Sequence, residues 1–161
     1  MKRSVSFSEI RGKVRAPASK SALQRLIALS WLSGGETKIL YPDYCNDVVS
    51  SLGIVQSLGA EVKREKSSVT ISSKDAAKRK YPAGEIRMLD CGESGLAIRM
   101  FSPVVSLLEG TFLLTASGSL ERRPAGIITE TLASFGLDIS DNGGFPPVRI
   151  TGPLKGGDAA V

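Results

Sequence analysis

A chain of 161 residues, of which 42% are hydrophobic and 23% charged, is long enough to bury a core and has the ordinary composition of a soluble globular protein. Its 21 basic and 16 acidic residues give a formal net charge of +5, which suits anionic ligands, nucleic acid among them. The chain has no histidine and two cysteines, Cys45 and Cys91, which excludes a plausible zinc site and a cysteine–histidine nucleophile and predicts two buried, reduced thiols.

Residues 1–14 form a leader in which Val5, Phe7 and Ile10 give the alternation typical of a strand. The amino terminus lacks the apolar stretch of a signal peptide. The most apolar segment of the chain, residues 101–115, is interrupted by charge and glycine and is too short to span a membrane. We therefore predict a soluble, cytoplasmic protein with no membrane partner.

The elements that follow the leader come in two runs of the same order. The first run is predicted as a helix, a strand, a helix and two short strands, over residues 19–33, 37–40, 46–58, 61–64 and 68–72. Gly34 ends the first helix, and Asn46 or Asp47 is expected to cap the second. The two short strands alternate in polarity, so one face of their sheet is expected to meet water.

The second run repeats this order, over residues 94–108, 111–115, 124–135, 137–140 and 147–151. When the two runs are aligned, their helix ends match and Arg25 of the first corresponds to Arg99 of the second. The pattern predicts an internal repeat, with repeat one over 15–78 and repeat two over 79–161. The lysine-rich segment 74–80 is expected to be a solvated linker between them.

Apolar residues cover most of the circumference of the first and third predicted helices. In the first helix they are Leu23, Leu26, Ile27, Ala28, Leu29, Trp31 and Leu32. A helix that is apolar nearly all round is expected to be buried. The predicted fold class is therefore α/β (α+β), with repeated βαβαββ units, buried parallel helices and outer mixed sheets. The chain ends as if another element were to follow, which indicates two repeats of an incomplete three-repeat lobe.

Three cationic clusters lie at the starts of predicted helices: Ser19–Ser21 with Arg25, Gly92–Gly95 with Arg99, and Glu121–Pro124. Helix N-termini carry unpaired N–H groups and partial positive charge, so each cluster suits an anion. If the buried helices run parallel, the clusters converge on one rim. An unpaired Arg25 on a buried helix would be costly, which favours a bound anion. Pro124 pushes Arg123 into an extended conformation. Each cluster alone also has a structural explanation. The first can be a capping serine beside solvated cations, the second an ion pair of Arg99 with Glu93 or Asp90, and the third two exposed arginines in a loop.

Four motifs in this order resemble the 5-enolpyruvylshikimate-3-phosphate synthases, also called 3-phosphoshikimate 1-carboxyvinyltransferases. They are Pro17–Ser21 with Arg25, Gly92–Gly95 with Arg99, Glu121–Pro124, and Asp141–Gly144 followed by Pro147–Ile150. The resemblance covers essentially the whole chain, and the family's proteins are far longer, with two lobes of three repeats each. It implies that the chain corresponds to the first two repeats of the amino-terminal lobe and that the leader strand belongs with the second lobe.

The resemblance implies a reaction in which the 5-hydroxyl of shikimate 3-phosphate attacks phosphoenolpyruvate and phosphate leaves from a tetrahedral intermediate. It implies no metal or organic cofactor and a monomeric full-length enzyme. An aromatic content of only 6%, with no long basic run, argues against a nucleic-acid partner. Lys20 would be catalytic and would contact both substrates. Ser21 and Arg25 would hold shikimate 3-phosphate, Gly95 and Arg123 would bind phosphoenolpyruvate, and Arg99 would be a supporting cation.

Two positions depart most clearly from the family's pattern: Ala18 stands where glycine is often found, and Leu96 stands where serine or threonine is usual. Since the second lobe is absent, we expect this polypeptide alone to be inactive. Two other functions remain open from the residues, a stand-alone anion-binding module and a basic nucleic-acid-binding domain. A further alternative is the related enolpyruvyl transferase that acts on UDP-N-acetylglucosamine. Ser21 and a cysteine-free loop over 117–124 argue against that relative.

Overall fold

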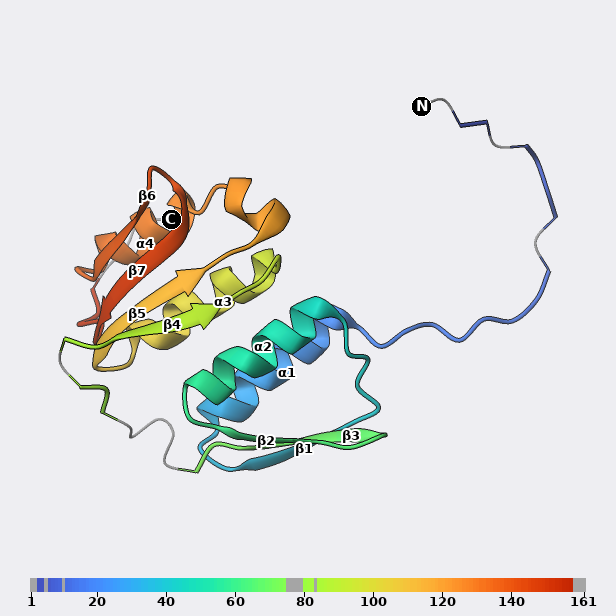
Figure 1. Ribbon diagram of the computed structural model, residues 1–161, viewed down its shortest axis with the longest axis horizontal. Helices are drawn as coiled ribbons and strands as arrows, with labels where there is room; N and C mark the ends of the chain where they lie inside the picture. The colour runs from blue at the N-terminus through green and yellow to red at the C-terminus, as the bar shows by residue number, and fades with distance from the viewer. Residues whose placement is uncertain (1–2, 5, 10, 75–79, 83, 158–161) are drawn as a thin grey trace.

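The computed structural model of the chain describes residues 3–4, 6–9, 11–74, 80–82 and 84–157. In this part of the chain three helices lie between two β-sheets, and a fourth helix packs beside the second sheet (Figure 1). The helices are α1 (Lys20–Leu32), α2 (Asn46–Ser57), α3 (Gly95–Ser106) and α4 (Gly126–Ser134). A short 3-10 helix, η2 (Gly118–Arg122), precedes α4. The chain therefore has a mixed α/β fold, as its sequence predicts.

The first sheet contains three strands in the spatial order β1 (Glu36–Leu40), β3 (Ser68–Ser72) and β2 (Glu61–Arg64). Both neighbouring pairs are antiparallel. The prediction of a mixed sheet is thus wrong for these described strands. Helix α2 returns the chain so that β2 runs in the direction of β1, and β3 then lies between them, antiparallel to both.

The second sheet contains four strands in the order β4 (Ile86–Asp90), β5 (Gly110–Thr115), β7 (Phe145–Gly152) and β6 (Asp138–Asn142). This sheet is mixed, because β4 pairs parallel with β5 while the other pairs are antiparallel. The sequence pattern does not indicate β4 as a strand. Leu89 is its one fully buried side chain, and the apolar but exposed Ile86 and Met88 hide the strand's alternation.

The other predicted helices and strands lie within two residues of their observed ends. No strand precedes α1 in the described residues of the leader, which run away from the body of the molecule (Figure 1). A strand formed by the leader with a segment outside this chain stays a prediction. Most of the predicted linker 74–80 lies outside the described residues.

Helix α1 is buried on one side only. Leu23, Ile27 and Trp31 pack into the core that α2, α3 and β3 share with it. Leu29 on the opposite side is 59% exposed, and Leu26 and Leu32 are exposed with it. The prediction that this helix is buried all round is therefore wrong for the described chain. An apolar surface shows what a helix can bury, whereas the elements that cover it decide what it does bury.

The two cysteines lie in opposite environments. Cys91 is fully buried, and burial with the neighbouring Asp90 charge raises the pKa of Cys91 to about 12. Cys45 is exposed, so the prediction of two buried thiols is wrong for this residue. Cys45 is also the N-cap of α2, a position predicted for Asn46 or Asp47, and its side chain makes no capping hydrogen bond.

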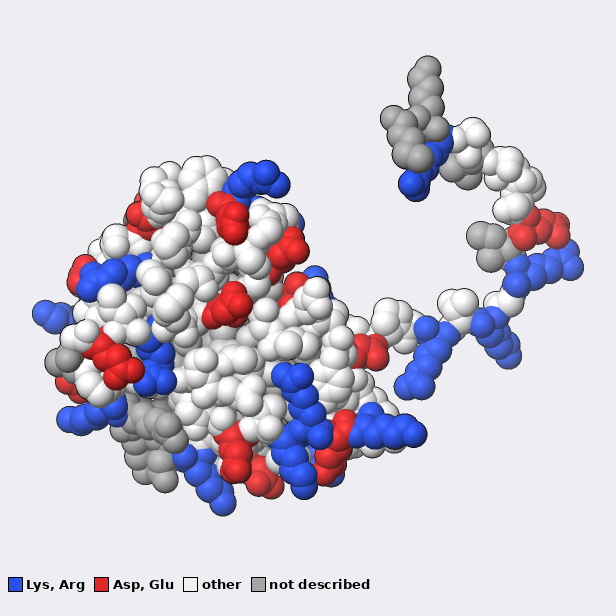
Figure 2. All heavy atoms as spheres, viewed as in Figure 1, with Lys and Arg blue, Asp and Glu red and all other residues white. Residues whose placement is uncertain are grey.

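Charged side chains of both signs share the surface seen in Figure 2. Lysine and arginine side chains lie along the leader and near the edge of the first sheet, with acidic side chains among them. Among the described residues, no helix combines the length and the apolar character needed to cross a bilayer.

A two-residue turn of Gly143 and Gly144 joins β6 to β7, and both glycines have positive φ, 62° and 89°. These values are typical of a type I′ hairpin, which needs residues that tolerate the left-handed region. The Asp141 carboxylate accepts hydrogen bonds from the Gly144 amide (2.8 Å) and from the Thr129 hydroxyl (2.6 Å). It therefore ties the hairpin to α4. These two hydrogen bonds, with that from Thr129 the stronger influence, lower the pKa of Asp141.

Leucine-to-alanine substitutions on two helices test where the core lies. Leu52 of α2 is fully buried, so Leu52→Ala is expected to lower the free energy of unfolding by about 2–5 kcal/mol. Leu29→Ala on the exposed side of α1 is expected to cost less than about 1 kcal/mol. Urea unfolding followed by circular dichroism measures both values. Equal losses would contradict the one-sided burial of α1.

Replacement of Asp141 tests the hairpin tie through its pH dependence. Because the folded-state pKa is lowered, the ionised carboxylate stabilises the fold above its unfolded-state pKa of about 3.9, and this contribution is lost as the pH falls through the folded value. We expect Asp141→Asn to lower the free energy of unfolding at neutral pH, and the gap to wild type to shrink toward about pH 3. Urea titrations at both pH values measure the gap. Asp138→Asn, exposed on the same strand, is the control. A difference in unfolding free energy between wild type and Asp141→Asn that stayed the same at both pH values would refute the role of the Asp141 carboxylate.

Candidate active site

The amino-terminal ends of α1, α2 and α3 open onto one cleft of about 450 Å³. Its lining residues are Lys20, Ser21, Gln24, Asn46, Asp47, Glu93, Gly95, Leu96, Arg99, Ser119 and Arg123. Each of the three cationic clusters contributes to it, through Lys20, Arg99 and Arg123. Since helix N-termini carry partial positive charge, three of them at one cleft favour a bound anion.

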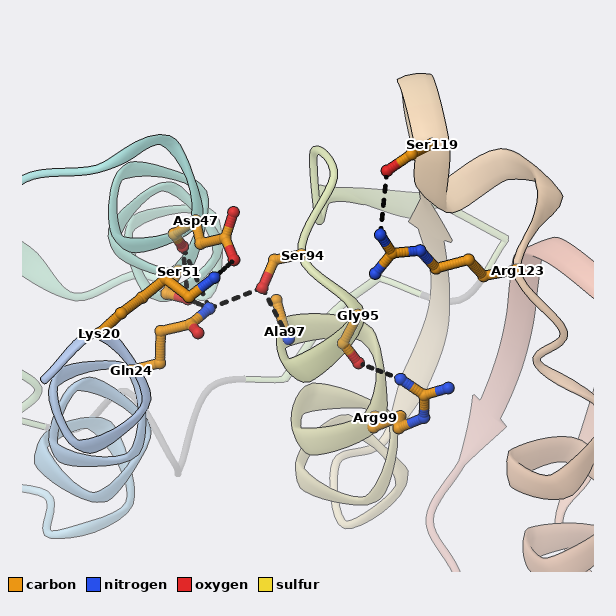
Figure 3. A network of polar contacts seen from close by, with 10 residues as sticks. All are labelled: Lys20, Gln24, Asp47, Ser51, Ser94, Gly95, Ala97, Arg99, Ser119 and Arg123. Atoms are coloured by element: carbon orange, nitrogen blue, oxygen red, sulfur yellow. Dashed lines mark hydrogen bonds and ion pairs between the residues drawn. The ribbon is translucent and has the colours of Figure 1, made fainter. Parts of the chain in front are cut away.

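Lys20 is the first residue of α1, because the Ser19 hydroxyl before it caps the helix by accepting a hydrogen bond from the Ala22 amide. The Lys20 ammonium lies 2.8 Å from a carboxylate oxygen of Asp47, in the first turn of α2 (Figure 3). The hydrogen bond and the negative charge of Asp47 raise the pKa of Lys20, so the ammonium stays protonated. The ion pair holds this cation at the mouth of the cleft.

The second wall of the cleft is the start of α3. The Ser94 hydroxyl caps this helix by accepting a hydrogen bond from the Ala97 amide at 3.1 Å. The Arg99 guanidinium donates to the Gly95 carbonyl at 3.0 Å (Figure 3). A Cβ atom on Gly95 would lie 2.9 Å from one nitrogen of Arg99 and 3.6 Å from one of Arg123. Gly95 therefore lies between two guanidinium groups, and its missing side chain leaves them room.

Arg123 reaches the cleft from the loop between η2 and α4. Its backbone is extended, with φ −95° and ψ 130°, as the following proline predicts. Its guanidinium donates to the Ser119 hydroxyl at 3.3 Å, and the Ser119 amide donates to the Glu93 carboxylate at 3.0 Å. Glu93 thus connects the turn before α3 with the loop that carries Arg123. The hydrogen bonds from Ser119 lower the pKa of Glu93, so the carboxylate stays ionised.

Gly118 fits this junction because of its backbone and its neighbour. Its φ is +54°, in the left-handed region, and a Cβ there would lie 2.6 Å from the carboxyl carbon of Glu93. A side chain at this position would therefore push the carboxylate away from the Ser119 amide. Glycine lets the loop close onto Glu93.

Arg25 does not line the cleft. Its side chain is exposed, and its guanidinium donates to the Ser21 carbonyl at 3.0 Å, one turn earlier on α1. The argument that an unpaired Arg25 would be buried is therefore wrong, because α1 exposes the side on which it lies. Ser21 and the half-buried Leu96 do line the cleft.

Sequence patterns do not indicate Asp47, Glu93 or Gln24 as part of the site in these roles. The sequence predicts Asp47 only as a helix cap. Its ion pair with Lys20 joins residues that are 27 positions apart in the chain. Gln24 is fully buried and makes hydrogen bonds to α2 and to the start of α3. These contacts join segments that are far apart in the sequence, so no local residue spacing predicts them. Within the described residues, histidine, cysteine, aspartate and glutamate side chains form no group of three that could hold a metal ion.

A family model of EPSP synthase (3-phosphoshikimate 1-carboxyvinyltransferase) matches residues 6–161 of the chain. Similar curated proteins include the 3-phosphoshikimate 1-carboxyvinyltransferases of Methanocorpusculum labreanum, 35% identical, and Korarchaeum cryptofilum, 34% identical. The alignments cover 100% and 98% of this chain, which spans 37% of the length of each relative.

Among solved structures, two of EPSP synthase from Acinetobacter baumannii superpose on the chain with TM-scores of 0.77 and 0.79. They are 29% and 28% identical to it, and the superpositions cover 88% and 90% of this chain and 32% and 33% of theirs. The sequence match over nearly the whole chain and the shared fold lead to the same conclusion. The chain belongs to the EPSP synthase family.

Proposed function

We propose that this chain forms one wall of an enolpyruvyl transferase site. The full site binds shikimate 3-phosphate and phosphoenolpyruvate, transfers the enolpyruvyl group to the 5-hydroxyl and releases phosphate. The proposal depends on the convergence of Lys20, Arg99 and Arg123 with three helix N-termini at one cleft, in a member of the EPSP synthase family. Both substrates carry phosphate and carboxylate groups, which such a cleft suits through charge-assisted hydrogen bonds.

Lys20 is the proposed catalytic residue, in contact with both substrates. Its pKa is raised by Asp47, so it is a permanent cation. A fixed cation stabilises the negative charge that develops on the phosphoenolpyruvate side as the tetrahedral intermediate forms. An ammonium group has three N–H donors, so Lys20 can keep Asp47 as a partner while it donates to a ligand.

Shikimate 3-phosphate is assigned to Ser21 and Arg25. Ser21 lines the cleft, whereas Arg25 lies one turn further along α1, outside the lining, and donates to the Ser21 carbonyl. That hydrogen bond is exposed, and a bound carboxylate or phosphate offers the guanidinium a stronger, charge-assisted partner. Arg25 is therefore proposed to turn from the carbonyl to the substrate.

Phosphoenolpyruvate is assigned to Gly95 and Arg123, with Arg99 as a supporting cation. Gly95 opens the start of α3 between the two guanidinium groups, so an anion can approach the backbone there. Arg99 is bonded to the Gly95 carbonyl, which places its charge beside this position. The half-buried Leu96 gives the adjoining wall an apolar surface.

Residues 15–78 and 79–161 are proposed as two related units of a three-unit lobe. The second has the order βαβαββ, whereas the described residues of the first lack the leading strand. The exposed Leu26, Leu29 and Leu32 of α1 support this, because a further unit of the same lobe would bury them. The chain spans 37% of the length of its relatives, so the opposite wall of the site would come from segments outside it. We therefore propose that this polypeptide binds substrate groups without turnover.

Binding measurements on the 161-residue chain test the proposed roles. Isothermal titration is expected to show binding of shikimate 3-phosphate and of phosphoenolpyruvate. Lys20→Met is expected to weaken both by roughly 10–100-fold, the effect of a lost hydrogen bond to a charged group. Lys66→Met is the matched control, because Lys66 is exposed in the turn between β2 and β3 and does not line the cleft.

Equal affinities for wild type and Lys20→Met would refute the role of Lys20. With both substrates present, phosphate release by the chain alone is expected to be absent. Steady release would refute the proposal of an incomplete site. Binding of a wide range of small anions with similar affinity would favour a stand-alone anion-binding module instead.

Gly95→Ala tests the phosphoenolpyruvate assignment. The new methyl group would meet the end of the Arg99 side chain at 2.9 Å, and this flexible group can move aside. The fold is therefore expected to keep its stability, while the affinity for phosphoenolpyruvate falls and that for shikimate 3-phosphate stays within about twofold. Gly53→Ala on α2, which meets nothing within 4 Å, is the control. Equal weakening of both ligands would contradict the assignment.

A further inference from the structure

We propose that Gln24 is a positioning residue that sets the distance between Lys20 on α1 and the phosphoenolpyruvate wall at the start of α3. This inference rests on the proposed function. Gln24 lies one helical turn after Lys20 and lines the same cleft, yet its side chain is fully buried. Its contacts reach both other helices whose N-termini form the cleft.

The side-chain amide of Gln24 contacts three acceptors on two helices (Figure 3). Its Nε2 lies 2.7 Å from the hydroxyl of Ser94, the N-cap of α3. The same nitrogen lies 3.0 Å from the Ser51 hydroxyl and 3.2 Å from the Asp47 carbonyl, both on α2. One side chain thus connects the start of α1 to the helix that carries Lys20's ion-pair partner and to the helix that carries Gly95.

The orientation of this amide is fixed by its surroundings. The Asp47 carbonyl can only accept a hydrogen bond, and the Ser51 hydroxyl already donates to that carbonyl at 3.0 Å. The Ser94 hydroxyl oxygen accepts from the Ala97 amide. The flipped amide would place Oε1 against the Asp47 carbonyl oxygen, which is repulsive. The NH₂ group therefore faces α2 and α3.

The other end of the amide indicates that Gln24 does more than fill space. Its Oε1 is buried, and within the described residues no donor reaches it. An unpaired buried acceptor costs free energy, which an apolar side chain of the same size would avoid. This cost occurs at a position where the NH₂ group of the same side chain connects three helices beside the cleft. We therefore infer that those contacts are the reason for a glutamine here.

The contact between Gln24 and Ser94 is expected to affect the binding of one substrate and not of the other. Phosphoenolpyruvate is assigned to Lys20 on α1 together with Gly95 and Arg123, so its site spans the contact between Gln24 and Ser94. Shikimate 3-phosphate is assigned to Lys20, Ser21 and Arg25, all on α1. A change in the spacing of α1 and α3 therefore weakens the first ligand and spares the second.

Gln24→Met tests this, because methionine has a similar length and volume but no NH₂ group. In the 161-residue chain we expect about tenfold weaker binding of phosphoenolpyruvate, with shikimate 3-phosphate within about twofold. In the Lys20→Met background the same substitution is expected to add little, since Gln24 is proposed to act by setting the position of Lys20 relative to α3. Gln56→Met, at an exposed glutamine of α2, is the matched control. If Gln24→Met does not fold, Gln24→Asn, which is one methylene too short to reach Ser94, takes its place.

A nuclear magnetic resonance spectrum of each variant gives a readout that does not need a ligand. The Gln24 variants are expected to shift the amide resonances of Gly95 and Ala97 at the start of α3, and Gln56→Met is expected to leave them in place. Unshifted resonances, unchanged phosphoenolpyruvate affinity or equal weakening of both ligands would each overturn the positioning role. If the wild-type chain binds neither substrate, the proposed function fails, and the resonances still decide whether Gln24 sets the start of α3.

Discussion

Three helix N-termini at one cleft impose the electrostatic constraint on which this structure depends. Each terminus carries partial positive charge, and three cationic side chains join them. The chain offsets this repulsion with its own acceptors. Hydroxyl groups of Ser19 and Ser94 cap α1 and α3, and the carboxylates of Asp47 and Glu93 lie at the cleft beside Lys20 and the Ser119 amide. These contacts hold Lys20 and Arg123 in fixed positions at the cleft.

The same acceptors also give the cleft its geometry. Asp47 holds Lys20 at the mouth, and Glu93 draws the loop of Ser119 toward α3 and brings Arg123 with it. The negative residues of this cationic site are thus its supports. Their removal would leave the cations without fixed positions, although the net positive charge of the cleft would rise.

Local signals in the sequence predict much of this. Serine before Lys20 and glycine after the helices mark the helix ends, and alternation marks most strands, so the elements and the cationic clusters can be placed from the chain alone. Contacts between segments far apart in the sequence cannot be predicted from such local signals. The bond from Gln24 to Ser94 spans 70 positions, and the one from Ser119 to Glu93 spans 26. Exposure of one side of α1 is equally non-local, because it depends on which elements the chain supplies as neighbours.

The two sheets share no strand in the described part of the chain, and this has a consequence for how such a site can change. Among the described strands, backbone hydrogen bonds form within one sheet or within the other. The two sheets with their helices therefore meet through helix packing and through side-chain contacts. Gln24 bonds the Ser94 hydroxyl, and Arg87 donates to the Ser57 carbonyl. Substitutions at this junction can therefore alter the width of the cleft while both sheets keep their registers. An evolving lineage can tune the fit of its ligands there, one residue at a time, without rebuilding the scaffold.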